Sequence, residues 1–172
     1  MVKLWRCVIC GDPYVGANPP NNCPFCGAHG EFILEAKEAV VTFEVPLSEK
    51  DRSHAEHALQ VEVSNAAFYR CAAEKTDDAE CKLLFKALGK IEGEHAAIWR
   101  KVLRLSGIPA VNETCHVENL KNLNESHERE TRAIDFYRKA ARESNSERLR
   151  EIFQALVDIE TDHLHLSEER MR

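Results

Sequence analysis

Two segments of the chain carry the same pair of metal-binding side chains. Glu92 and His95 form a Glu-x-x-His pair, and Glu160 and His163 repeat it 68 residues later. Residues three apart share one face of a helix, so each pair points a carboxylate and an imidazole in the same direction. Apolar residues beside the pairs recur at the same offset, as in Phe85/Phe153, Leu88/Leu156 and Ile91/Ile159.

The same offset relates two further segments, each with one glutamate and one tyrosine. Glu62 matches Glu130, and Tyr69 and Tyr137 follow them by seven residues, about two helical turns. One Glu from each of two helices, with Glu-x-x-His from each of two others, is the ligand set of a di-iron carboxylate bundle. A single Glu-x-x-His is common on solvated helix faces, but charges beside an apolar stripe must be paired or metal-bound. The repetition therefore favours a metal site.

A second candidate site lies near the N-terminus. Two Cys-x-x-Cys pairs supply four thiols: Cys7, Cys10, Cys23 and Cys26. Four thiolates at this range suit a tetrahedral zinc or a single iron, and spacing alone leaves both open. Gly11 and Gly27 follow the pairs and allow a positive φ that turns backbone N–H groups toward sulfur. So short a unit needs its metal as a staple.

Composition narrows the class of protein. The net charge of −6 and the pI near 5.8 argue against nucleic-acid binding. No apolar run reaches the roughly 20 residues that cross a bilayer, and no secretory signal is evident at the start. Cys71, Cys81 and Cys115 bring the cysteine count to an odd seven, which favours reduced thiols in a cytoplasmic protein.

Hydrophobic periodicity and capping signals predict the elements that position these residues. We expect a metal-stapled unit over residues 1–38, an extended linker over 39–48 and a four-helix bundle over 49–172. The predicted helices span about 49–75, 78–106, 116–143 and 147–170. Their expected N-terminal capping pairs are Ser48 with Asp51, Asp77 with Glu80, and Ser144 with Glu147. The first helix has an inner stripe of Ala55, Leu59, Glu62, Ala66 and Tyr69.

These motifs together resemble the rubrerythrin family. Cys-x-x-Cys-Gly followed by Cys-Pro-x-Cys-Gly, with Trp5 two residues before the first cysteine, is similar to its rubredoxin-like domain. The duplicated glutamate and Glu-x-x-His pattern is similar to its di-iron bundle. The resemblance implies a mainly α protein with a ferritin-like four-helix bundle. Because the cysteine unit comes first here, the order resembles that of a reverse rubrerythrin.

The resemblance also implies roles for the side chains. Glu62 and Glu130 would be terminal ligands, Glu92 and Glu160 bridging ligands, and the two histidines would hold one iron each. Tyr69 and Tyr137 would hydrogen-bond the bridging carboxylates or a bound oxidant, with simple core packing as the alternative. The family has a further Glu three residues after the lone Glu of its third helix, where this chain has Ala133. Glu128 and His127 are therefore candidate additional ligands.

The implied function is that of a non-haem di-iron peroxidase. It would reduce hydrogen peroxide to water with electrons from a reductase or rubredoxin, supplied by NAD(P)H and passed through the tetrathiolate iron. Because a site midway along a bundle lies far from its own N-terminal unit, we expect a head-to-tail homodimer or larger assembly, which also permits helix swapping. The alternatives are a ferroxidase or iron-storage protein, an electron carrier or redox sensor, and a zinc ribbon on a metal-free helical module.

Overall fold

The first part of the chain is a small antiparallel sheet. The computed structural model describes residues 1–172. Strands β1 (Lys3–Cys7), β2 (Pro13–Gly16) and β3 (Ile33–Glu35) form the order β2-β1-β3, and a 3₁₀ turn over Gly30–Phe32 leads into β3. The central strand ends at Cys7, so the sheet fixes one cysteine while turns carry the other three. We call residues 1–38 the cysteine unit.

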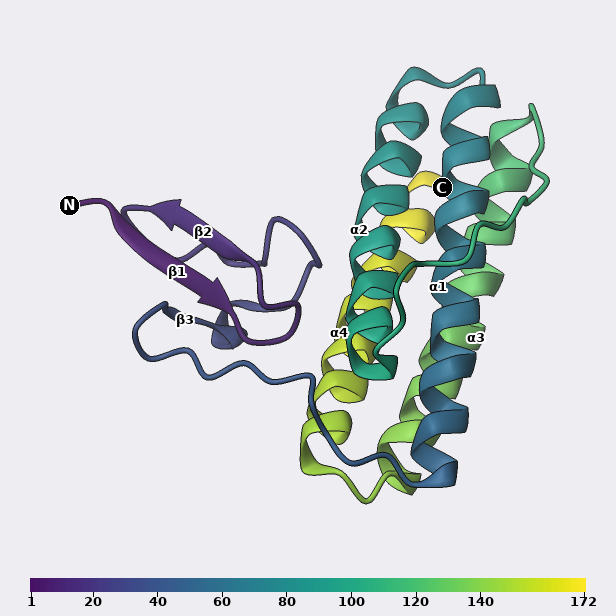
Figure 1. Ribbon diagram of the computed structural model, residues 1–172. Coiled ribbons are helices and arrows are strands. Elements are labelled where there is room, and N and C mark those ends of the chain that lie inside the picture. The colour runs from purple at the N-terminus through teal and green to yellow at the C-terminus, as the bar shows by residue number, and fades with distance from the viewer.

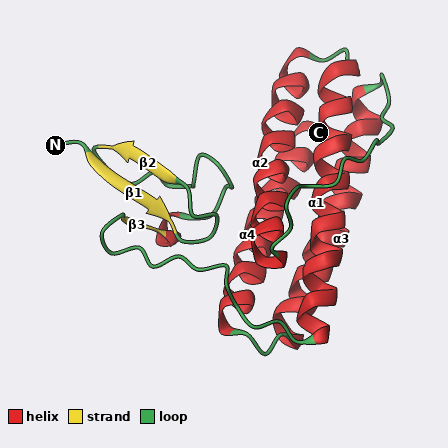
Figure 2. Cartoon of the chain, in the orientation of Figure 1, coloured by secondary structure: helices red, strands yellow, loops and turns green.

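Four long helices form the second part (Figures 1 and 2). They are α1 (Glu49–Lys75), α2 (Ala79–Leu103), α3 (Asn119–Glu143) and α4 (Glu147–Arg170). Helix α1 packs mainly against α2, and α3 mainly against α4. The predicted mainly α fold with a ferritin-like bundle is confirmed. None of the helices has the combination of length and apolar character that a membrane crossing needs.

The helix starts agree with the predicted signals in one case of three. Ser48 caps α1, where its hydroxyl accepts a hydrogen bond from the Asp51 amide. The predicted capping residues of α2 and α4, Asp77 and Ser144, were wrong by one and two residues, because Asp78 and Ser146 cap these helices. Ser144 instead ends α3 and donates its hydroxyl to Asp51 Oδ1 at 2.6 Å. Several capping residues in a row make the exact one hard to select from sequence.

The connection between α2 and α3 is longer than predicted. It covers residues 104–118, because α2 ends at Leu103 and α3 begins only at Asn119. Arg104 adopts a left-handed conformation with φ 56°, which ends α2 before the Gly–Ile–Pro sequence that we expected to end it. This crossover segment runs along the outside of α1 (Figure 1).

The cysteine unit packs on the bundle of its own chain, beside α2 and α4 (Figure 1). Ile9, Cys26 and Ile33 belong to the same buried cluster as Ile159 and Phe153 of α4. Three polar contacts border this interface: Lys101 Nζ donates to Cys10 O at 2.8 Å, Arg148 donates to Val8 O, and His29 pairs with Asp162 at 2.8 Å. The expectation that a site midway along the bundle lies far from its own N-terminal unit was wrong, because His95 Nε2 lies 2.8 Å from Cys26 O of the same chain. The reason that we gave for a head-to-tail assembly therefore falls away, although the assembly itself stays a prediction.

The prediction of reduced thiols outside the cysteine unit was wrong for one pair. Cys71 of α1 and Cys115 of the crossover segment form a disulfide across 44 residues of sequence. Cys81 is a buried free thiol, as expected. The pairing depends on where the crossover segment meets α1, which no local sequence pattern reports.

Candidate metal centres

The four thiols of the cysteine unit converge to the size of a tetrahedral metal site. Cys7 Sγ lies 3.7 Å from Cys26 Sγ, and Cys10 Sγ lies 3.8 Å from Cys23 Sγ. Metal–sulfur bonds of about 2.3 Å in a tetrahedron place neighbouring sulfurs about 3.8 Å apart. All four side chains are buried and none is in a disulfide. The residues therefore fit a rubredoxin-like metal site.

Glycine is needed after each Cys-x-x-Cys pair. Gly11 and Gly27 have φ values of 88° and 80°, in the region that side chains disfavour. Their N–H groups donate to the carbonyls of Cys7 and Cys23, at 3.0 and 2.9 Å. The expectation that these amides point to sulfur was thus wrong. The Asp12 amide, by contrast, donates to Cys10 Sγ at 3.4 Å.

Six polar side chains meet inside the bundle, one set from each helix. Glu62 of α1 and Glu130 of α3 face Glu92 and His95 of α2, and Glu160 and His163 of α4. The four carboxylates and His95 are 0% exposed, and His163 is 3% exposed. Apolar packing does not explain six such groups in one core, because buried charges need partners. Two divalent cations would balance four carboxylates.

The distances divide the carboxylates into two kinds. Both oxygens of Glu92 are in use: Oε2 lies 3.2 Å from His95 Nδ1, and Oε1 lies 3.2 Å from His163 Nδ1. Glu160 also contacts both imidazoles: its Oε1 lies 3.3 Å from His95 Nδ1, and its Oε2 lies 2.8 Å from His163 Nδ1. Glu62 reaches only His95 Nδ1, at 3.4 Å. Carboxylates that contact both imidazoles are placed to bridge two ions, whereas one that contacts a single imidazole is placed to hold one.

The potential ligand atoms form two overlapping groups. Within each group the ligand atoms all lie within 4.8 Å of one another, and Glu92 and Glu160 belong to both groups. One adds Glu62 and His95, and the other adds Glu130 and His163. Although the atoms are close, both oxygens of Glu160 and Nδ1 of His163 lack a hydrogen-bonding geometry. Buried acceptors that converge without pairing fit a shared metal centre, and this donor set fits a di-iron one.

The electrostatics of the metal-free cluster favour protons on it. Burial raises the pKa of Glu62 and of Glu130 well above the usual value, and neighbouring carboxylates raise it further. Burial alone would lower the pKa of His95 and of His163, but the facing carboxylates hold it well above the usual value. Metal binding must therefore displace protons from this cluster.

The tyrosines contact the lone glutamates across the bundle. Tyr69 donates its hydroxyl to Glu130 Oε1, and Tyr137 donates to Glu62 Oε1. Hydrogen bonding by both was expected, but the predicted acceptors, the bridging carboxylates, were wrong. The reason is that α1 and α3 lie next to each other in the bundle, so each tyrosine reaches the glutamate of the other half of the duplication. Burial raises the pKa of both hydroxyls well above the usual value, which keeps them proton donors.

The two proposed additional ligands lie away from this cluster. Glu128 is 66% exposed and pairs with Arg132. His127 is 37% exposed and pairs with Glu168. These two predictions were wrong, because the third helix turns both residues outward, and Ala133 adds no donor.

Sequence reasoning missed a difference between the two halves. The Tyr69 hydroxyl also contacts Ser126 Oγ at 2.8 Å, and Ser126 contacts Ser167 at 2.7 Å. The matching positions of the duplication hold Ala58 and Trp99, so Tyr137 has no such hydroxyl chain. Comparison of the two halves position by position was the signal that could have found it.

One hydrogen bond links the two candidate centres directly. His95 Nε2 lies 2.8 Å from the backbone carbonyl oxygen of Cys26. Because a carbonyl only accepts, Nε2 carries the proton, and Nδ1 is left free to face the carboxylates. Gly27 sits at the same contact, where an added Cβ would lie 3.1 Å from Ile159 Cγ2. The path from the Cys26 sulfur to the His95 ring thus consists of the covalent bonds within Cys26 and one hydrogen bond.

Comparisons with known proteins agree with both centres. Residues 5–33 match the family model described as rubrerythrin, rubredoxin-like domain, and residues 55–171 match the model described as rubrerythrin. Among curated proteins, reverse rubrerythrin-1 of Clostridium acetobutylicum is 40% identical over 37 residues, or 22% of this chain. That match spans 20% of the relative's length. No solved structure gives a significant match.

Proposed function

Because the chain belongs to the rubrerythrin family of di-iron oxidative-stress proteins, we propose that it reduces hydrogen peroxide to water. The order of the two matched regions, with the rubredoxin-like one first, is that of a reverse rubrerythrin. The single observation that carries the proposal is the hydrogen bond between His95 and Cys26, which gives electrons a short route between the two centres of one chain.

We assign the metal ligands by their contacts. Glu92 and Glu160, which belong to both groups of ligand atoms, would be shared by two ions, Glu62 and Glu130 would each serve one ion, and each histidine would hold one ion through Nδ1. Cys7, Cys10, Cys23 and Cys26 hold the single iron of the cysteine unit. A pair of ferrous ions held by these six side chains would supply the two electrons that reduction of one peroxide needs. The donor set of the cysteine unit also accepts zinc, so the metal must be identified in the isolated protein.

The surrounding residues prepare the site in three ways. The bundle excludes water, since five of the six side chains are 0% exposed. The Tyr69 and Tyr137 hydroxyls each hold one oxygen of a terminal glutamate and leave the other oxygen to the metal. The Cys26 carbonyl fixes the His95 tautomer, as a hydrogen bond to the remote nitrogen of a metal-binding imidazole does.

The electron supply follows from the position of the cysteine unit. A one-electron site at the surface of the bundle suits delivery by a reductase or a small redox protein, with NAD(P)H as the source upstream. Because NAD(P)H-dependent reductases of this kind work in the cytoplasm, we propose a cytoplasmic location. A head-to-tail homodimer, with or without swapped helices, remains part of the proposal, although the route through His95 does not require a second chain.

The test is an anaerobic reaction of the reduced, iron-loaded protein. One sample is mixed rapidly with hydrogen peroxide and a matched sample with dioxygen, while the visible absorption of the tetrathiolate and of the di-iron centre is followed. Faster oxidation by peroxide, with the tetrathiolate oxidised in step, is the expected result. Preference for dioxygen with accumulation of ferric iron would identify a ferroxidase instead. No reaction at full iron occupancy would leave an electron carrier or sensor.

A further inference from the structure

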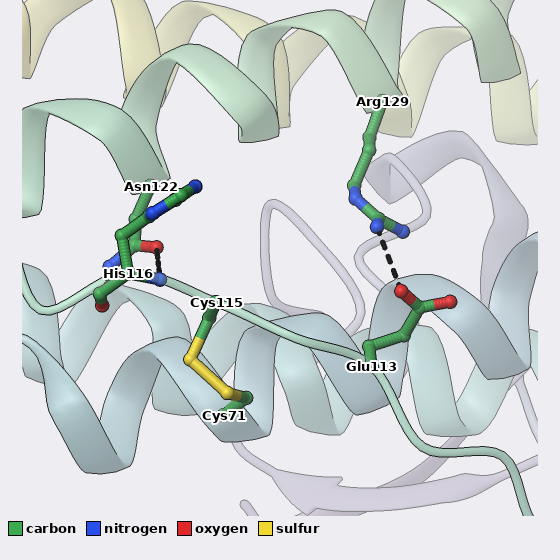
Figure 3. The surroundings of a disulfide bond; sticks show 6 residues. All are labelled: Cys71, Glu113, Cys115, His116, Asn122 and Arg129. Carbon is green, nitrogen blue, oxygen red and sulfur yellow. Dashed lines mark hydrogen bonds and ion pairs between the residues drawn. A yellow bond between two sulfur atoms is a disulfide. The ribbon is translucent and has the colours of Figure 1, made fainter.

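The crossover segment is held to the bundle at three adjacent points (Figure 3). Glu113 accepts hydrogen bonds from Ser64 at 2.6 Å and from Arg129 at 3.1 Å. Cys115 is bonded to Cys71 of α1. His116 exchanges two backbone hydrogen bonds with the Asn122 side chain, at 2.9 and 2.8 Å. By contrast, residues 104–110 are exposed throughout. The polar and covalent attachment of the segment is thus concentrated in three residues, Glu113, Cys115 and His116.

The bundle side of this clamp adjoins the candidate di-iron centre. Cys71 lies two residues after Tyr69 on α1, and Arg129 directly precedes Glu130 on α3. Tyr69 and Glu130 are hydrogen-bonded to each other. Arg129 also lies over the Phe68 ring, 4.5 Å from its centroid. The clamp therefore joins α1 and α3 on the outer side of the same pair of residues that meet at the metal cluster.

The two cysteines are accessible enough to react. Both are only half-buried, whereas Cys81, in the apolar cluster against which Cys115 packs, is buried. Their Cα atoms are 5.8 Å apart, within the usual range for a disulfide, so the helix and the segment need not move for the bond to form. In a cytoplasmic protein, thiols are normally kept reduced, and a disulfide that forms there is typically a transient or sensing one.

We propose that Cys71 and Cys115 are a reversible thiol–disulfide couple, oxidised by hydrogen peroxide, that clamps the crossover segment beside the di-iron centre. One thiolate attacks a peroxide oxygen, the O–O bond breaks, and a sulfenic acid and the first water result. The second thiol attacks that sulfur, the S–S bond forms and the second water leaves. The two sulfurs lose two electrons and peroxide gains two. A dithiol of the thioredoxin class reverses the step.

The proposal rests on the proposed function in the choice of peroxide as oxidant and in the cytoplasmic location. Thiol oxidation here uses neither the bundle irons nor the cysteine unit. The same samples can be assayed for peroxide consumption driven by a reductase. Absence of that activity, together with oxidation of Cys71 and Cys115 by peroxide, would refute the peroxidase and still support the thiol–disulfide couple.

The first experiment measures the state of each thiol in the iron-loaded, full-length protein. The protein is treated with dithiothreitol, freed of it, and exposed to graded hydrogen peroxide beyond the amount that oxidises the irons. After acid quenching and alkylation, peptide mapping reports Cys71, Cys115 and Cys81 separately. We expect Cys71 and Cys115 to lose alkylation together while Cys81 keeps it. Free thiols at both positions in excess peroxide, or a disulfide that resists excess dithiothreitol in the folded protein, would overturn the proposal.

The second experiment measures the clamp. A Glu-specific protease cuts after Glu113, which is held in the clamp, and after Glu118, which is exposed. Reduction should speed cleavage at Glu113 roughly tenfold relative to that at Glu118, because the local opening equilibrium shifts toward the open form. Reduction should also lower the melting temperature by on the order of 10 °C.

Variants separate the disulfide from general effects of the treatment. Cys115→Ser and the double variant Cys71→Ser/Cys115→Ser should behave as the reduced protein under all conditions. Cys81→Ser should respond to peroxide and dithiothreitol like the unmodified chain. Equal cleavage ratios in the oxidised protein and in the double variant would overturn the clamp.

Discussion

The contact at Gly27 allows a stringent test of how the two centres communicate. Replacement of Gly27 by alanine adds a Cβ 3.1 Å from Ile159 Cγ2, tighter than ordinary van der Waals contact. Ile159 is 1% exposed and lies in the buried core cluster. Gly11→Ala is a matched control, because Gly11 also has a positive φ but its Cβ would lie 3.4 Å from the half-buried Phe43 and Val41.

The magnitude follows from two terms. A side chain in the left-handed region costs about 1–2 kcal/mol, and both variants share this cost. Overpacking against Ile159 adds about 1–3 kcal/mol in Gly27→Ala alone. This second term acts on docking of the cysteine unit and lowers the docked-to-undocked ratio by roughly 5- to 150-fold, since 1.4 kcal/mol is a factor of ten.

The assay is the rate of tetrathiolate oxidation after rapid mixing of the reduced protein with peroxide. We expect Gly27→Ala to slow it by about tenfold, toward the lower end of the range set by that docking term, and Gly11→Ala to change it less than about twofold. Iron content and thermal unfolding are measured on both variants, so that a loss of metal is not mistaken for a loss of contact. Equal rates in the two variants would refute the route through Cys26 and His95.

Three further predictions concern the bundle and the cysteine unit. Tyr69→Phe should weaken iron loading more than Tyr137→Phe, by on the order of 1 kcal/mol, because it also deprives Ser126 of a partner. Competitive iron titration of both variants measures this difference, and the opposite order would contradict the prediction. Burial would raise the pKa of Asp51, but hydrogen bonds from Ser144 and a second serine hold it below the usual value. The stability that this carboxylate provides is therefore present above about pH 3.9 and lost as the pH falls through the lower folded-state pKa, so urea midpoints should drop less at acid pH in Asp51→Asn. Removal of the metal from the cysteine unit should make residues 1–48 sensitive to protease while the bundle keeps its helical circular dichroism, and a protected, metal-free unit would contradict the stapling argument.

Local geometry explains why the ligand set could be predicted from the sequence. The Glu92/His95 spacing is fixed within one helix, and the duplication supplies the partner pair without any knowledge of tertiary contacts. The start of α1 could be predicted for the same reason, because Ser48 and Asp51 interact within one turn.

Relations between elements could not be predicted in this way. The acceptor of each tyrosine depends on how α1 and α3 pack against each other, and a position seven residues after a glutamate does not report that packing. The Cys71–Cys115 bond joins residues 44 apart through the path of the crossover segment. Contact of Gly27 with Ile159 depends on docking of the cysteine unit, whereas the sequence predicts only a positive φ at this glycine.

The 68-residue duplication has a consequence for the ancestry of the chain. Neither helical hairpin owns a complete metal site, since each of the two groups takes at least one carboxylate from the other hairpin. A single hairpin with one Glu and one Glu-x-x-His would have had a full ligand set only when two copies met. The crossover segment would then be the linker that joined two copies of one ancestral gene. The two halves, expressed as separate polypeptides, should reassemble around iron.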